Sequence, residues 1–213
     1  MTDRSMEFAA LLCSRLCHDL LSPVGALNNG LELLADETDP EMRRRCLELL
    51  GDSARTSANK LKFFRLAFGS AGGFGDQVPS TEARAAIEGM FAATGRVTIG
   101  WMVTDEQLDK RAAKILLNLA LIGGEALVRG GRLDVGAEQG ANGVEIVIRA
   151  EGARIVLDPE LRAALTGKLA ADAVSARTSA AWMTRTLVGE VGGDIMMSEP
   201  EEPALLLGAH LPV

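Results

Sequence analysis

The chain has 213 residues, 47% of them hydrophobic, and its formal net charge at neutral pH is −7. This length and apolar content suit one domain or two small ones with a hydrophobic core, and they exclude a disordered chain. The acidic balance and the scarcity of aromatic residues argue against binding of a nucleic-acid backbone or stacking of its bases. We therefore expect no nucleic-acid partner.

The sequence also gives no sign of a membrane or an export route. The N-terminus lacks a basic region followed by an apolar run, so we expect no signal peptide. Residues 115–128 are the most apolar stretch, but Asn118 and Glu125 interrupt it and it is too short to span a bilayer. The three cysteines are odd in number, which favours a reducing compartment over a disulfide framework. We expect a cytoplasmic protein with no membrane partner.

The first predicted element is a long helix over residues 6–35, with Pro23 inside it and expected to bend it. Leucines recur along this helix at helical spacing, so they form one apolar stripe made of Leu16, Leu20, Leu27, Leu31 and Leu34.

His18 is one of only two histidines and lies two residues from both Leu16 and Leu20, about 200° round the helix. It should point away from the stripe, on a face shared with Ser14, Leu21, Ser22 and Gly25. An exposed imidazole is close to its pKa at neutral pH and can act as a nucleophile. Asp19 follows directly and could orient the ring or take a proton. The alternative is a surface histidine without a role.

A turn leads into a second helix predicted over residues 40–68, with Asp39 as its N-cap and Pro40 in its first position. Two long helices joined by a short turn must be antiparallel. The hairpin has too little core to stand alone, so we expect a second copy of the chain to complete a four-helix bundle. The alternative is that the hairpin packs on the rest of its own chain.

The antiparallel register places position 18 level with about position 58. Lys60 and Arg65 should therefore lie near His18, and Arg15 adds a third positive charge at the same end. Such a cationic rim suits a phosphoryl group or an acidic partner, although an ordinary solvated helix face is the alternative.

Gly69 ends the second helix, and a glycine-rich linker is predicted over residues 70–79. Further helices are predicted at 81–93, 107–129, 158–165 and 178–191, and strands at 97–103, 132–137, 144–150, 194–198 and 204–211. This order predicts a helix layer on a mixed sheet. The fold class is therefore α+β, with a hairpin domain at 1–69 and an α/β sandwich at 80–213.

The run His18-Asp19-Leu20 with Pro23, followed by a helical hairpin, resembles the dimerisation and phosphoacceptor domain of sensor histidine kinases. The elements after residue 80 are similar to the Bergerat-type ATP-binding domain of those kinases. The resemblance implies a nucleotide site there, but its motifs are degenerate.

Kinases of this class carry two asparagines four apart on the long helix, whereas Asn118 is here followed by Ile122. Ala150 stands where the family has the carboxylate that reads adenine, and Arg154 stands where it has a glycine. The stretch 178–181 contains no glycine to present backbone NH groups to phosphates. The comparison implies a domain that keeps the kinase fold and has lost ATP. Glu125, on the same helix as Asn118, is expected to face water.

A histidine-bearing hairpin joined to a degenerate nucleotide domain resembles the ChpT family of histidine phosphotransferases. The matching runs are Arg15-Leu16-Cys17-His18-Asp19 and Arg65-Leu66-Ala67-Phe68-Gly69. The resemblance implies a homodimer that shuttles phosphoryl groups between receiver-domain aspartates, with no ATP and with Mg²⁺ supplied by the receiver. It also implies a CckA-type hybrid sensor kinase upstream and CtrA- and CpdR-type response regulators downstream.

We therefore expect His18 and Asp19 to be catalytic. The residues expected to contact a receiver are Ser14, Arg15, Leu21, Ser22, Gly25, Lys60 and Arg65.

Three other functions remain open on the sequence alone. The chain could be a fragment of an ATP-dependent sensor histidine kinase, or a pseudokinase that binds a partner without chemistry. A metal sensor using Cys13, Cys17 and His18 is disfavoured, because His18 lies about 100° from Cys17 round the helix and a fourth ligand is missing. We expect a phosphorelay intermediate rather than an autonomous kinase, with no metal site of its own.

Overall fold

The structure is a computed structural model that describes residues 2–69 and 75–212, with side chains from residue 5 onward. The described residues form six α-helices in the predicted order, of which α5 is the shortest. The helices are α1 (Thr2–Asp36), α2 (Pro40–Ala67), α3 (Ser80–Ala92), α4 (Lys110–Ala126), α5 (Pro159–Leu165) and α6 (Ser179–Gly189). The strands are β1 (Gln77–Pro79), β2 (Val97–Trp101), β3 (Gln107–Asp109), β4 (Gly131–Gly140), β5 (Gly143–Glu151), β6 (Asp194–Met197) and β7 (Leu205–Pro212).

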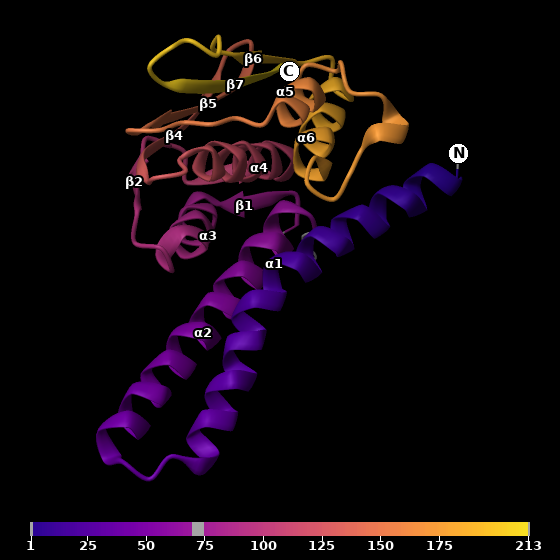
Figure 1. The fold of residues 1–213 in the computed structure, drawn as a ribbon. Coiled ribbons are helices and arrows are strands. Elements are labelled where there is room, and N and C mark those ends of the chain that lie inside the picture. The colour runs from indigo at the N-terminus through magenta and orange to yellow at the C-terminus, as the bar shows by residue number, and fades with distance from the viewer. Residues whose placement is uncertain (1, 70–74, 213) are drawn as a thin grey trace.

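The helical hairpin is formed by α1 and α2, as predicted. Asp39 caps α2 by accepting a hydrogen bond from the Met42 backbone N–H, and Pro40 occupies the first turn. A Cβ added at Gly30 would lie 2.9 Å from Leu50, so the two helices approach closely at this level. α1 continues through Pro23, and Figure 1 shows that it changes direction near the place where the hairpin meets the rest of the chain.

The main sheet has five strands in the order β2-β4-β5-β7-β6. β2 and β4 are parallel, and the remaining neighbours are antiparallel. A mixed sheet covered by helices was predicted and is confirmed. Figure 1 shows the sheet on one side, α4 and α6 beneath it, and the tip of the hairpin projecting away from both.

A two-stranded sheet of β1 and β3 was not predicted. Each of these strands is only three residues long and carries no readable alternation. β3 occupies the residues with which the long helix was predicted to begin. α4 therefore starts three residues later, where the Asp109 side chain accepts hydrogen bonds from the backbone N–H groups of Arg111 and Ala112. Part of the predicted linker, residues 70–74, lies outside the described residues.

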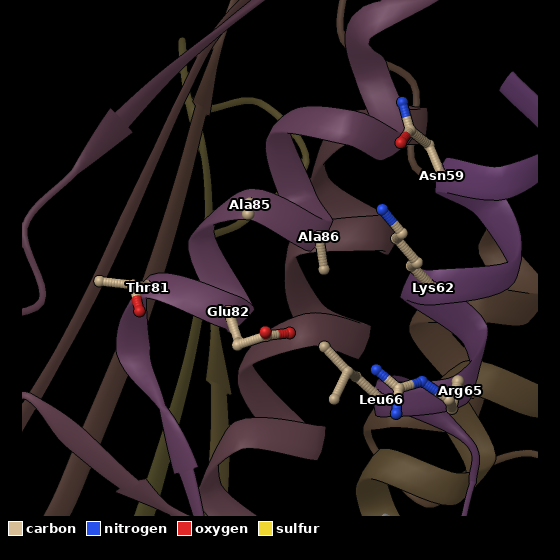
Figure 2. Close-up of a pocket in the computed structure, with 8 residues that line it drawn as sticks. All are labelled: Asn59, Lys62, Arg65, Leu66, Thr81, Glu82, Ala85 and Ala86. Atoms are coloured by element: carbon tan, nitrogen blue, oxygen red, sulfur yellow. The ribbon is translucent and has the colours of Figure 1, made fainter. Parts of the chain in front are cut away.

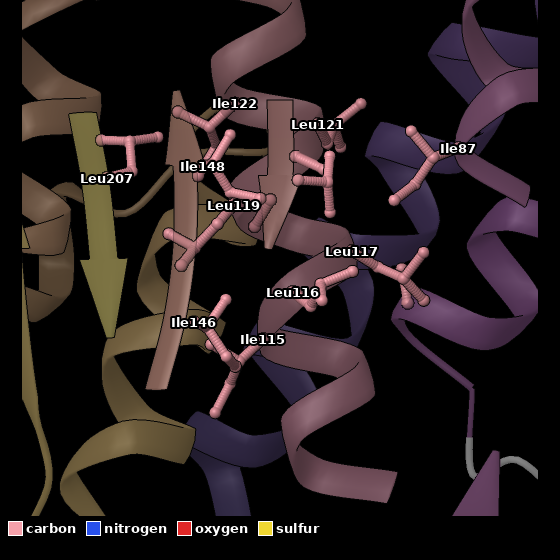
Figure 3. Packing of buried hydrophobic residues seen from close by; sticks show 14 of the residues in the cluster. Ile87, Ile115, Leu116, Leu117, Leu119, Leu121, Ile122, Ile146, Ile148 and Leu207 are labelled. Carbon is pink, nitrogen blue, oxygen red and sulfur yellow. The ribbon is translucent and has the colours of Figure 1, made fainter. Parts of the chain in front are cut away.

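Helix α4 is the centre of the core. Thirteen of its 17 residues are buried, because it is covered by the sheet on one side and by α2 and α3 on the other. Figure 3 shows α4 between Ile146, Ile148 and Leu207 of the sheet and Ile87 of α3. Two adjacent glycines permit this contact on both sides. A Cβ at Gly123 would lie 3.0 Å from Ile148, and one at Gly124 would collide with the Phe91 ring of α3.

The end of α2 nearest the sandwich shares this core. Phe63, Phe64, Leu66 and Ala67 are at most 3% exposed and belong to the same hydrophobic cluster as α4. The predicted alternative, packing of the hairpin on its own chain, therefore holds for this end only. Farther along the hairpin, large apolar side chains remain exposed, among them Leu31, Leu33, Leu47 and Leu49. No helix in the described part of the chain has the length and hydropathy that a bilayer span requires.

Candidate functional site

His18 lies on α1 and points outward, as its spacing from the leucine stripe predicted. Its side chain is 84% exposed. On the same face, Ser14, Leu21 and Ser22 are exposed and Gly25 is half-buried. A bulky partner could therefore reach the imidazole directly.

Asp19 is the hydrogen-bond partner of the imidazole. The His18 Nδ1 lies 3.0 Å from the Asp19 Oδ1. Because an ionised carboxylate only accepts hydrogen bonds, this contact assigns the proton to Nδ1. In the neutral ring, Nε2 then carries a lone pair and no proton. The ring is therefore poised to act as a nucleophile through Nε2.

Asp19 is itself held by two cationic side chains. The Arg15 Nε donates to the Asp19 Oδ2 over 2.8 Å, one helical turn back along α1. The Lys60 Nζ, on α2, donates to the Asp19 backbone oxygen over 2.8 Å. This second contact agrees with the predicted antiparallel register. The Asp19 side chain is only 13% exposed, so its position is well determined.

Arg15 continues the chain of contacts to α4. Its Nη2 donates to the Glu125 Oε1, and this ion pair joins the hairpin to the central helix of the sandwich. Burial acts to lower the pKa of Arg15, but the carboxylates of Glu125 and Asp19 outweigh it and leave the pKa raised. Burial raises the pKa of Glu125, and the Arg15 guanidinium only partly offsets this. His18, Asp19, Arg15 and Glu125 thus form one connected series.

Two cationic side chains are placed differently from the prediction. Arg15 was expected on an exposed rim, but its side chain is 9% exposed and is directed at two carboxylates. Its charge is therefore already compensated within the protein. Arg65 is exposed, but it lies five residues from Lys60, about 140° round α2, so the two do not share a face.

Arg65 lines a pocket of about 390 Å³ between α2 and α3. Figure 2 shows Lys62 and Arg65 reaching from α2 across the pocket, with Glu82 of α3 opposite. The predicted cationic rim is thus divided between the surroundings of Asp19 and this separate pocket.

Glu125 was expected to face water, and it is indeed exposed, but it also has a partner that was not expected. Its side chain is 38% exposed and pairs with Arg15. A carboxylate in the mostly apolar stretch 115–128 favours a cationic partner, and this was the signal available in the sequence. The identity of the partner could not be read there, because Arg15 is 110 positions away along the chain.

The positions of the nucleotide motifs offer little to ATP. Asn118 is fully buried, and its amide donates to the backbone oxygens of Ala67 and Lys114. Its Oδ1 has no hydrogen-bond partner among the described residues. Ile122, which stands where the kinases have their second asparagine, is buried and apolar. Ala150 is buried in β5 and has no carboxylate to read a base. These residues do not fit the nucleotide site of a kinase.

No group of three or more His, Cys, Asp or Glu side chains suited to a metal ion occurs among the described residues. Cys13 and Cys17 are exposed on α1, and Cys46 is a buried residue of α2.

Comparisons with known proteins agree with this arrangement. Residues 80–203 match the model of the histidine phosphotransferase C-terminal domain. The protein phosphotransferase ChpT of Brucella abortus (strain 2308) is 34% identical over 202 residues, which cover 95% of each chain.

Solved structures show the same relationship. The structure of a bacterial phosphotransferase has a TM-score of 0.83 and 32% identity, with 96% of each chain covered. The histidine kinase domain of a blue-light activated kinase from Erythrobacter litoralis has a TM-score of 0.50 at 10% identity, over 99% of this chain and 94% of that one, and shares the fold alone. The family model and the long match to a curated relative together show that this chain belongs to the ChpT-type histidine phosphotransferases.

Proposed function

We propose that this chain is the phosphorelay intermediate that carries phosphoryl groups between receiver-domain aspartates on His18, without using ATP. The observation that carries the proposal is the exposed imidazole whose Nδ1 is hydrogen-bonded to Asp19 and whose Nε2 is left free. Phosphoryl transfer has a loose transition state, so positioning and charge stabilisation supply most of the catalysis.

In the transfer step, the Nε2 lone pair of His18 forms a bond to the phosphorus of a receiver's aspartyl phosphate. The bond between phosphorus and the aspartyl oxygen breaks, and the carboxylate leaves with the electron pair. The imidazole ring gains positive charge while Nδ1 keeps its proton. Asp19, 3.0 Å from Nδ1, stabilises that charge. The same steps in reverse pass the group to the aspartate of a second receiver.

The magnesium ion for this reaction would be held by the receiver, and this chain would contribute orientation. Ser14, Leu21, Ser22 and Gly25 form the face of α1 beside His18 and would contact the receiver. Leu21 is 73% exposed, so it offers an apolar anchor there. Lys60, beside Asp19, would engage an acidic group of the receiver, and Arg65 would do so from the separate pocket between α2 and α3, whereas Arg15 would act through Asp19. By family resemblance, the receivers belong to a CckA-type hybrid kinase and to CtrA- and CpdR-type regulators in the cytoplasm.

A homodimer is supported by an exposed apolar face of the hairpin that continues the leucine stripe of α1 and is separate from the face of His18. Val24 and Leu31 lie seven residues apart on α1, and Leu47 and Leu61 are two heptads apart on α2. All four are between 44% and 57% exposed. Val24 lies about 120° from His18 round α1, so this face and His18 point in different directions. A second copy packed here would complete a four-helix bundle and leave His18 accessible.

A transfer assay tests the proposal. Purified protein is mixed with a phosphorylated receiver, and separately with labelled ATP. We expect label from the receiver only, and its loss in His18→Ala. The matched control is His210→Ala, which removes the other histidine of the chain, on β7, and should transfer normally. Label taken directly from ATP would instead support an autonomous kinase, and transfer that persists in His18→Ala would refute the proposal.

A further inference from the structure

The chain of contacts behind His18 crosses from the hairpin to the most buried helix of the protein. Within the described residues, the His18 side chain hydrogen-bonds to Asp19 alone, and the Asp19 carboxylate is in turn held by Arg15. Arg15 is fixed in turn by Glu125 on α4. The orientation of an imidazole that is almost fully in solvent is therefore connected to a rigid part of the fold.

We propose that Glu125 is a positioning residue of the phosphotransfer site, acting through Arg15 and Asp19 to hold His18 with its proton on Nδ1 and Nε2 free. This inference rests on the proposed function, since it concerns the same histidine. Glu125 does not touch the reacting atoms.

The geometry of the guanidinium explains how Glu125 acts at a distance. Arg15 uses Nε for Asp19 and Nη2 for Glu125, and these two nitrogens belong to one planar group. Fixing one end of the group fixes the direction of the other. The Arg15 side chain is 9% exposed, so water has little access to replace either carboxylate. Without Glu125, Nη2 would lack its partner and the guanidinium could rotate away from Asp19.

The anchor of this series is well placed to be rigid. The residues on either side of Glu125, Gly124 and Ala126, are both buried in the core between the sheet and α3. A functional group is held most accurately when the elements that support it are themselves locked by packing. The charges that act on Glu125 are those of Arg15, Asp19 and Lys60, all of which belong to the His18 site.

The two histidines of the chain allow a direct test. With ¹⁵N-labelled histidine, NMR of the full-length protein reports the ring tautomers of His18 and His210 only. In wild type we expect His18 to carry its proton on Nδ1. In Glu125→Gln, which keeps the size of the side chain and removes its charge, the His18 ring signals should move toward an averaged tautomer, whereas those of His210 stay in place.

Phosphoryl transfer is then measured in the same variants. Misplacement of reacting groups by about 1 Å can cost 10²-fold in rate, and a loosened orientation should cost less, so we expect Glu125→Gln to slow transfer by roughly 10-fold. Arg15→Lys keeps the charge but cannot bridge two carboxylates in one plane, and it should behave in the same way. The matched control is Glu88→Gln, which breaks another arginine–glutamate pair, with Arg84 on α3. It should change neither readout.

The outcomes separate this inference from the proposed function. Unchanged His18 signals in Glu125→Gln would overturn the inference, whether or not transfer slows, because Glu125 would not orient the ring. Shifted signals with a normal transfer rate would overturn it too, because the orientation would not matter. Failure of wild type to accept a phosphoryl group would refute the proposed function, and the NMR result would still show whether Glu125 orients His18.

Discussion

Replacing Asp19 by asparagine tests how the protein prepares His18 for attack. The asparagine keeps the size of the side chain but removes the charge that fixes the proton on Nδ1 and stabilises the ring during transfer. A hydrogen bond to a charged group contributes about 1.5–3 kcal/mol. Because His18 is 84% exposed, water competes for its Nδ1 and the lower end of that range applies. Since about 1.4 kcal/mol corresponds to a factor of ten, Asp19→Asn should slow transfer roughly 10-fold.

The assay is single-turnover transfer from a phosphorylated receiver, followed as phosphohistidine appears. The structure offers a matched control in Asp134 on β4. Its side chain is 10% exposed, against 13% for Asp19, and it also pairs with arginine, at 2.7 Å from Arg132. Asp134→Asn should keep the wild-type transfer rate. An Asp19→Asn protein that transfers as fast as wild type, or an equal loss in Asp134→Asn, would refute the reasoning.

Two further predictions concern assembly and stability. Leu31→Glu places a charge on the proposed dimer face and should give a monomer in analytical ultracentrifugation. Leu33→Glu, on a more exposed leucine about 200° round α1, should stay dimeric, and the reverse pattern would place the interface elsewhere. Asn118→Ala removes hydrogen bonds to Ala67 and Lys114, so it should lower the free energy of unfolding by roughly 1–3 kcal/mol. Urea denaturation measures this, and a stability equal to wild type would show that the unpartnered Oδ1 costs as much as those bonds contribute.

The fold was largely predictable because its elements carry strong local signals. The caps Asp39 and Asp158, each followed by proline, marked helix starts that the structure confirms. The two long strands around Gly140 and Gly143 were equally clear, and they are slightly longer than predicted. The short strands β1 and β3 were missed because three residues cannot establish a period, and only their pairing with each other defines them.

The site was predictable as far as one helix and the antiparallel register of the hairpin determine it. Spacing along α1 was enough to point His18 outward and to place Asp19 beside it. The role of Arg15 was misjudged, because its partner Glu125 comes from another part of the chain and no local pattern joins them. Arg65 was placed near His18 from its position along α2, but its direction round that helix leads into the pocket with Glu82. Long-range ion pairs and helix rotation are thus what the sequence left undetermined.

The bonds that join α2 to α4 have a consequence for how such a protein can work. A domain that delivers ATP to a histidine must travel to it and withdraw again. Here Phe63 and Phe64 of α2 are buried in the core of the sandwich. The Asn118 side chain of α4 donates a hydrogen bond to the backbone oxygen of Ala67, the last residue of α2. The ion pair between Arg15 and Glu125 connects α1 to α4 as well. Under the proposed function, a sandwich tied to both helices of the hairpin would be a fixed platform to which the receiver domains come, and it would not have to move for phosphoryl transfer to occur.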